Sequence, residues 1–241
     1  MRKIILTIGV MLFAVVQSFA HYLWIETSAK GEIGKEQEIR VYFGEYTYGV
    51  KEKIKGEAYM KVKDFTLWVV DAQGKKIRLN IEPKDDYYAA AFTPDAEGTY
   101  TVILDNDKID VVDFTKYNFG IFKTHYHAVS KIQVGDKANH TVADNAEGVA
   151  IKNISEEKGK VKLKVFYKGK ALPESEITVF VADQWSKTLE TDQNGIASFD
   201  LPWKTKYVVE VTKKEEVPGT YKDVAYEFIW HATTVSVNAN L

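Results

Sequence analysis

Apolar residues at every second position are the feature that most constrains how this chain can fold. Successive side chains of a β-strand point to opposite faces, so this alternation is typical of strands with one face in a core. Such stretches, rich in β-branched and aromatic residues, occur at 39–43, 65–70, 98–104, 161–166, 177–181, 197–201, 207–211 and 228–237. A helical period is limited to a short turn near 51–61. The pattern predicts an all-β protein built from sandwiches instead of βαβ units.

The stretch VGDKANHTVADNAEG, residues 134–148, has few apolar residues and many turn formers. It predicts a boundary between two β-sandwich domains, 21–135 and 150–241. In the second, GKALPESEITVFV and TDQNGIASFDLPWKTKYVVEV resemble the transthyretin-like or carboxypeptidase-regulatory-like modules. This resemblance implies an immunoglobulin-like fold for the second domain. It implies little about function, because such modules serve many roles.

Residues 1–20 have the pattern of a cleavable signal peptide. Arg2 and Lys3 precede an apolar run over 4–16, and Ser18 and Ala20 occupy the small-residue positions that signal peptidase reads. The apolar run is too short for a membrane span. We expect cleavage after Ala20 and a periplasmic or secreted protein. A chain without cysteine has no disulfides and no lipidated cysteine, which fits a bacterial periplasm.

The charge balance argues against polyanionic partners. The chain has 32 Lys and Arg against 34 Asp and Glu, so losing Arg2 and Lys3 with the leader changes the net charge from −2 to about −4. Both signs are interspersed along the chain, without a basic run. Nucleic acids and anionic membrane surfaces are therefore poor candidates as partners.

Cleavage after Ala20 would make His21 the first residue of the mature protein. Its α-amine and its imidazole can then close a chelate ring on one metal ion, an arrangement called a histidine brace. The amine must lose its proton to do so. Nitrogen ligands suit copper, nickel, cobalt and zinc better than calcium or magnesium. The alternative is that His21 is incidental and that HYLWIE is only the first strand.

Four further histidines are weaker candidates. His125 and His127 lie two apart in the strand-like stretch 123–134, so they project from one face with Tyr126 on the other. They can converge on one ion or stand side by side in water. In FIWHATTVSV, alternation places His231 half-exposed or at the domain interface. His140 lies in the predicted linker and is the weakest candidate.

The mature N-terminus, HYLWIETSAKGEIGKEQEIRVYFGEY, resembles a family of bacterial exported proteins that contain a domain of unknown function. FTLWVVDAQGKK, DAEGTYTV and the late WHATT strand are similar too. Members of this family are often assigned to periplasmic nickel or cobalt uptake. The resemblance therefore implies a metal-handling role with His21 as a ligand and possible contact with a membrane transporter component. Many members have a histidine where this chain has Glu45 in FGEY, so a carboxylate replaces an imidazole.

Three functions follow from these patterns. The first is a periplasmic binding protein for nickel, cobalt or copper that serves metal uptake or handling. The second is a copper-dependent histidine-brace oxidoreductase that acts on polysaccharide. The third is a carbohydrate- or protein-interaction module without a metal. If His21, His125 and His127 form one site, the first strand must lie beside the strand at 123–134, with Glu45 as a further ligand or a partner that orients an imidazole.

Overall fold

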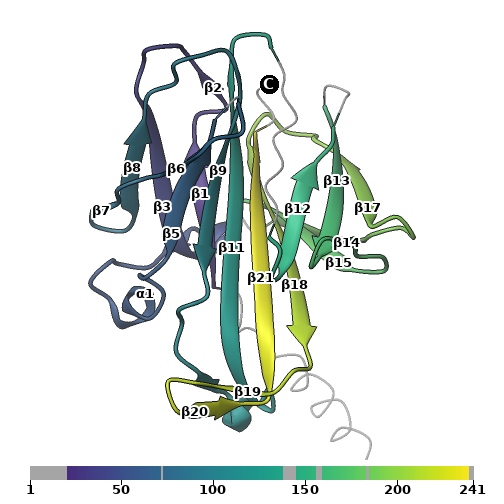
Figure 1. Ribbon diagram of the computed structural model, residues 1–241. Coiled ribbons are helices and arrows are strands. Elements are labelled where there is room, and N and C mark those ends of the chain that lie inside the picture. The colour runs from purple at the N-terminus through teal and green to yellow at the C-terminus, as the bar shows by residue number, and fades with distance from the viewer. Residues whose placement is uncertain (1–20, 72, 138–144, 156–158, 183–184, 239–241) are drawn as a thin grey trace, which may run out of the picture.

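The computed structural model describes residues 21–71, 73–137, 145–155, 159–182 and 185–238, and their architecture is all-β, as predicted (Figure 1). Each stretch with the alternating pattern is a strand or the main part of one. The described helices are single turns: α1 (Glu57–Met60), η1 (Tyr46–Tyr48) and η2 (Thr115–Tyr117). No described helix combines the length and the apolar character that crossing a bilayer requires.

Sheet A has five strands in the order β1-β3-β8-β7, with β4 paired to β3. These strands are β1 (Tyr22–Thr27), β3 (Gln37–Glu45), β4 (Val50–Lys51), β7 (Glu82–Pro83) and β8 (Tyr88–Phe92). Its pairings are all antiparallel.

Sheet B has ten strands, with a main path β16-β15-β18-β21-β11-β9-β5-β6 and with β2 and β10 paired to β11. These strands are β2 (Lys30–Gly31), β5 (Thr66–Val70), β6 (Lys76–Arg78), β9 (Gly98–Asn106), β10 (Val112–Asp113), β11 (Ile121–Val134), β15 (Glu176–Val181), β16 (Trp185–Glu190), β18 (Lys206–Glu215) and β21 (Phe228–Asn238). The long strands β11 and β21 run side by side and parallel through the middle of the molecule (Figure 1).

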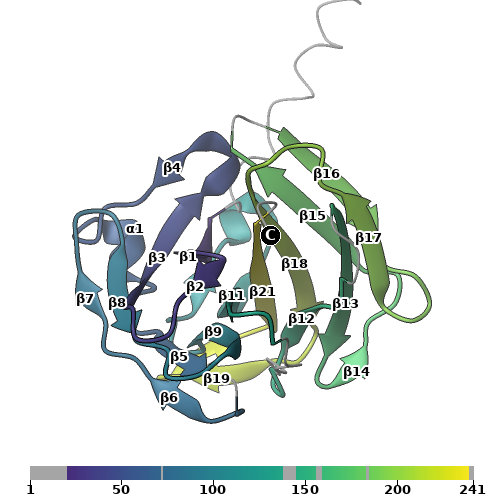
Figure 2. The same cartoon turned by 90° about the horizontal axis from the view of Figure 1, so that it is seen from above.

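Sheet C completes the main architecture on the other side of β11 and β21. It contains β12 (Val149–Asn153), β13 (Lys160–Tyr167), β14 (Lys170–Ala171) and β17 (Ile196–Asp200). A separate hairpin consists of β19 (Gly219–Tyr221) and β20 (Val224–Tyr226). Seen from above, β11 and β21 lie between the strands of sheets A and C (Figure 2).

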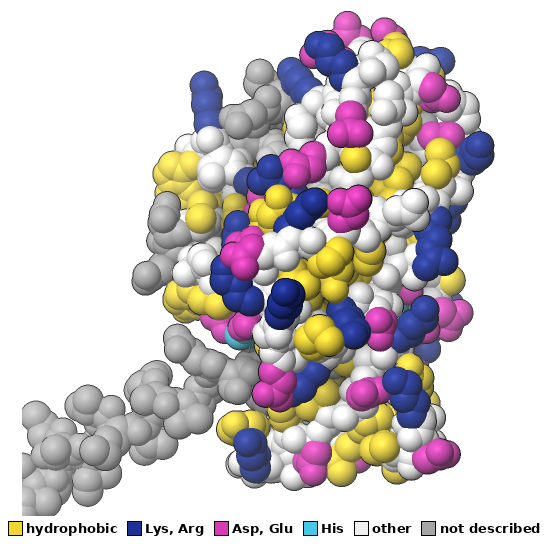
Figure 3. All heavy atoms as spheres, turned by 90° about the vertical axis from the view of Figure 1, so that its left-hand side faces the viewer, with side chains coloured by type: hydrophobic (Ala, Val, Ile, Leu, Met, Phe, Trp, Pro, Cys, Tyr) yellow, Lys and Arg dark blue, Asp and Glu magenta, His cyan; other side chains and the backbone are white. Residues whose placement is uncertain are grey.

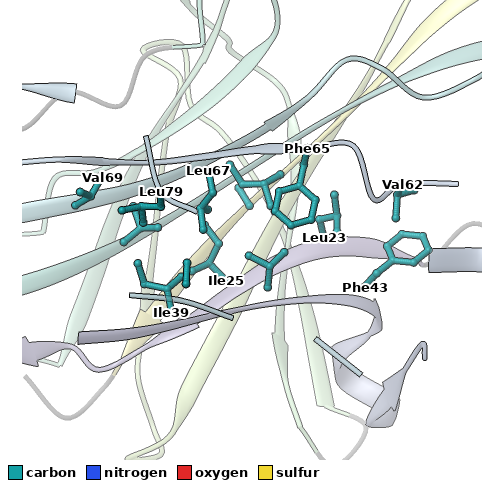
Figure 4. Packing of buried hydrophobic residues seen from close by; sticks show 14 of the residues in the cluster. Leu23, Ile25, Ile39, Phe43, Val62, Phe65, Leu67, Val69 and Leu79 are labelled. Carbon is teal, nitrogen blue, oxygen red and sulfur yellow. The ribbon is translucent and has the colours of Figure 1, made fainter. Parts of the chain in front are cut away.

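Two hydrophobic cores lie on the opposite faces of sheet B. The first fills the space between sheets A and B, where Leu23 and Ile25 of β1 meet Leu67 and Val69 of β5 (Figure 4). The second lies between sheets B and C. Because side chains alternate along a strand, Ala128 of β11 belongs to the first core and the next residue, Val129, belongs to the second.

The two cores correspond roughly to the two predicted domains, but one sheet serves both. Nine register pairs join β11 of the first half to β21 of the second, from Phe122↔Phe228 to Ser130↔Ser236. Most of the predicted linker, residues 138–144 with His140, lies outside the described residues. The division into two domains and the immunoglobulin-like character of the second therefore stay predictions.

Candidate functional site

The start of β1 brings His21 to the turn that follows β3. Tyr22 pairs with Gly44, so His21 lies next to Glu45, the last residue of β3. Gly44 is required here: its φ is +145°, and a Cβ at this position would lie 2.2 Å from the carbonyl oxygen of Val50. This close approach lets β4 fold back onto β3.

Two carboxylates flank the His21 ring, one at each nitrogen. Nδ1 lies 3.2 Å from Oε1 of Glu45, and Nε2 lies 2.9 Å from Oε1 of Glu52, the residue after β4. About a third of the His21 side chain, 34%, is exposed, so the group is accessible from solvent. Figure 3 shows a histidine side chain at the surface with acidic side chains beside it.

Two aromatic residues, one from each sheet, hold His21 in place. The hydroxyl of Tyr126 on β11 donates a hydrogen bond to the backbone carbonyl of His21 at 3.1 Å. The ring of Phe43 packs against the imidazole, with 5.5 Å between the centroids. The terminus of β1 therefore packs face to face against β11.

The structure separates His21 from His125 and His127, contrary to the single-site arrangement predicted from the sequence. Tyr126 points from β11 toward His21, so the flanking histidines project from the other face of sheet B. The alternation predicted along β11 is correct. What it could not give was that β1 lies across that face, as part of another sheet.

His125 and His127 share one carboxylate on that other face. Nε2 of His125 lies 2.8 Å from Oδ1 of Asp105 on β9, and Nδ1 of His127 lies 3.5 Å from the same oxygen. The second distance is long for a hydrogen bond, and both ring nitrogens of His127 are buried without a hydrogen-bond partner among the described residues. Burial disfavours the charged imidazole and lowers the pKa of His127.

His231 belongs to this second cluster and is only 2% exposed. Of the two alternatives predicted for His231, a half-exposed side chain does not occur; the other, a position at the domain interface, stays a prediction together with the domain division. His231 is the register partner of His125, with 5.4 Å between the ring centroids, and its Nε2 bonds to Oε2 of Glu215 at 2.8 Å. Burial lowers the pKa of His231 against the opposing effect of Glu215. β21 is covered on both faces, so alternation cannot identify an exposed face there.

The carboxylates of this cluster are held ionised by their partners. Burial raises the pKa of Asp105, but the hydrogen bonds and charges of His125 and His127 outweigh burial and lower it overall. Burial likewise raises the pKa of Glu215, and the bonds with Lys168 and His231 lower it to about 2. The hydrogen bonds of the cluster join β9 to β11 and β18 to β21, and the rings of His125 and His231 contact each other between β11 and β21.

The described residues contain no group of three or more His, Asp or Glu side chains placed to share one metal ion. At His21 the reason is geometric, because Glu45 and Glu52 lie at opposite ring nitrogens. The pair Nδ1 and Glu45 Oε1 is nevertheless spaced as two ligands of one ion would be. Ligands about 2.0–2.1 Å from a metal are separated by about 2.9–3.4 Å at right or tetrahedral angles, and the observed separation is 3.2 Å.

Sequence reasoning missed Glu52, Asp105 and Glu215. Each becomes a histidine partner only through pairings distant in the chain, such as β9 with β11 and β18 with β21. For Glu52 a weak signal existed, because the turn formers at 44–49 predict a reversal that returns the chain to the end of β3.

The fold and this site define an all-β protein with a histidine–carboxylate cluster at the start of its first strand. The chain belongs to the family described as "Domain of unknown function (DUF4198)", whose pattern matches residues 18–215. No curated protein matches the sequence.

Three solved structures illustrate a distant similarity. A DUF4785 family protein from Legionella pneumophila is 13% identical, with a TM-score of 0.30 and coverage of 78% of this chain and 50% of that one. A Salmonella alpha-2-macroglobulin is 10% identical, with a TM-score of 0.31 and coverage of 94% and 15%. The Parabacteroides merdae beta-glucuronidase is 11% identical, with a TM-score of 0.25 and coverage of 90% and 24%. The chain thus spans half or less of the length of these proteins.

Proposed function

We propose that the mature protein binds a first-row transition metal ion, nickel, cobalt or copper, at His21 and serves metal uptake or handling in the periplasm. The observation that carries this proposal is the pair of carboxylates at the two nitrogens of one accessible imidazole. The resemblance to exported proteins assigned to nickel or cobalt uptake supports this choice of metal ions. A transporter component in the membrane would be the partner that receives the ion.

The two carboxylates have different roles in this proposal. Glu52 accepts a hydrogen bond from the Nε2–H group of His21, which leaves the lone pair on Nδ1. Nδ1 is the nitrogen that forms a six-membered chelate ring with the α-amine. Histidine ligands are commonly oriented by a carboxylate in this way. Glu45 lies at Nδ1 and would be the third donor. The amine becomes available only when the chain begins at His21, so the proposal depends on cleavage after Ala20.

The histidine-brace oxidoreductase has less support. Such a centre needs a second imidazole beside the terminal one, and the other described histidines project from the opposite face of sheet B. The proposed donors are the α-amine and Nδ1 of His21 together with the carboxylate of Glu45. This set suits the reversible binding of a cargo ion better than it suits a copper oxidase centre.

The test is metal titration calorimetry with copper, nickel and cobalt on two forms of the mature protein. One form begins at His21 and the other carries one additional glycine before it. We expect the extended form to bind more than tenfold more weakly, because it lacks the chelating amine. Glu52→Gln should weaken binding about 10- to 100-fold, and Glu82→Gln, an exposed change on β7, should not. Equal affinity of the two forms would remove the α-amine from the site.

A further inference from the structure

A cavity of about 280 Å³ lies beside the His21 site, on the face of sheet B that is turned toward sheet A. Aromatic rings dominate its lining: Phe43, Phe114, Phe119, Phe122, Tyr126 and Trp230. His21 and Glu210 also line it. Pockets for drug-sized ligands are usually about 300–1,000 Å³, so this volume suits a small organic molecule.

Glu210 is the anomalous residue of this cavity. It lies in the middle of β18, paired with Thr178 and Thr234, on the face that carries Val208. No described residue forms a hydrogen bond or an ion pair with its carboxyl group. Burial alone raises the pKa of this carboxyl to about 8. The side chain is partly exposed to solvent through the cavity. A carboxyl that has lost most of its hydration and has no partner is costly, and such groups concentrate at binding sites.

The charges around the cavity favour a cation as the missing partner. Glu210 is the acidic residue among the lining residues, and His21, which also lines the cavity, has Glu45 and Glu52 at its two ring nitrogens. Lys61 is the only lysine or arginine among the lining residues, and its ammonium group already bonds to Glu57 at 2.8 Å. Aromatic rings attract cations through the negative potential of their faces, most strongly where water is excluded.

We propose that this cavity binds a small organic cation, with its ammonium group at the carboxylate of Glu210 and its apolar body among the aromatic rings. The ligand class is an amine with a hydrocarbon body of about the size of one ring. This site is separate from metal binding, because neither Glu210 nor the aromatic rings belong to the donor set around His21.

The experiment uses the mature full chain in the presence of EDTA, so that a failure of metal binding cannot affect it. Three probes of similar size and different charge are titrated by calorimetry: benzylammonium, benzyl alcohol and benzoate. We expect benzylammonium to bind at least about tenfold more tightly than benzyl alcohol, as a charge-assisted hydrogen bond implies. Benzoate should bind most weakly, because it places a second negative charge near Glu210.

Glu210→Gln should abolish the preference for benzylammonium over benzyl alcohol, whereas Glu190→Gln, an exposed change on the edge strand β16, should preserve it. Equal binding of benzylammonium and benzyl alcohol to the unmodified protein would overturn the proposal, whether or not the Glu210 variant folds. An unchanged preference in Glu210→Gln, or no binding of benzylammonium, would also overturn it.

Discussion

The unpaired carboxyl of Glu210 should make the stability of this protein fall as the pH rises. The folded protein holds the proton of Glu210 up to a pKa of about 8, whereas an unfolded chain loses it near 4.5. Between these values the folded state binds more protons than the unfolded state, so the free energy of unfolding decreases with increasing pH. The stability that depends on this proton is fully present below about pH 4.5. It is lost as the pH rises toward about 8, and above that pH the free energy of unfolding no longer changes through Glu210.

The magnitude follows from about 1.4 kcal/mol for each unit by which the pKa is raised. The shift to about 8 sets an upper bound near 5 kcal/mol, and solvent screening of this partly exposed side chain reduces it to about 2–3 kcal/mol. Glu210→Gln removes the titration while preserving shape. We therefore expect the variant to be about 2–3 kcal/mol more stable than the unmodified protein at pH 8.5, and much less so at pH 5.

Urea unfolding at a series of pH values from 5 to 8.5 measures this difference. Glu190→Gln is the control, because an exposed carboxyl on β16 should change stability by less than about 0.5 kcal/mol at each pH. A stability difference between Glu210→Gln and the unmodified protein that does not vary with pH would refute the reasoning.

Two further predictions concern the second histidine cluster. Glu215→Gln should lower the free energy of unfolding by about 1–2 kcal/mol at pH 6, because it removes the charged partner of His231 and Lys168. The pKa of Glu215 is lowered to about 2, so its stabilisation is present above its usual value and is lost as the pH falls toward 2. Urea unfolding at pH 6 and pH 3 should show a smaller difference at pH 3. Gly148→Ala should lower the free energy of unfolding by about 1–3 kcal/mol in the same assay. A Cβ at this position would lie 2.7 Å from Nδ1 of His231 and 3.1 Å from Nδ1 of His125. An unchanged urea midpoint would contradict this close packing.

The strands could be predicted from the sequence because most of them have one face in a core. Their order could not, since β1 pairs with β3 while packing across β11, and β21 returns to lie parallel to β11. Both central strands are covered on two faces, so the burial of His231 has no signal in the alternation. For the site, the proximity of Glu45 to His21 follows from the antiparallel pairing of β1 with β3, which are separated in the chain by the short strand β2 alone. The roles of Asp105 and Glu215 depend on long-range register, which a single sequence does not contain.

The carboxyl groups on the two faces of sheet B differ in their partners. On the face toward sheet C, His125 and His231 each bond to a carboxylate, and the partners lower the pKa of both carboxyl groups. On the face toward sheet A, the Glu210 carboxyl has no partner among the described residues and raises the energy of the folded state. A carboxylate that is paired with a histidine stabilises the fold without a ligand, whereas the carboxyl of Glu210 beside the cavity gains a partner in the organic cation that we propose. His125 and His231 therefore contribute to the packing of β11 against β21, and both binding sites that we propose lie on the side of His21.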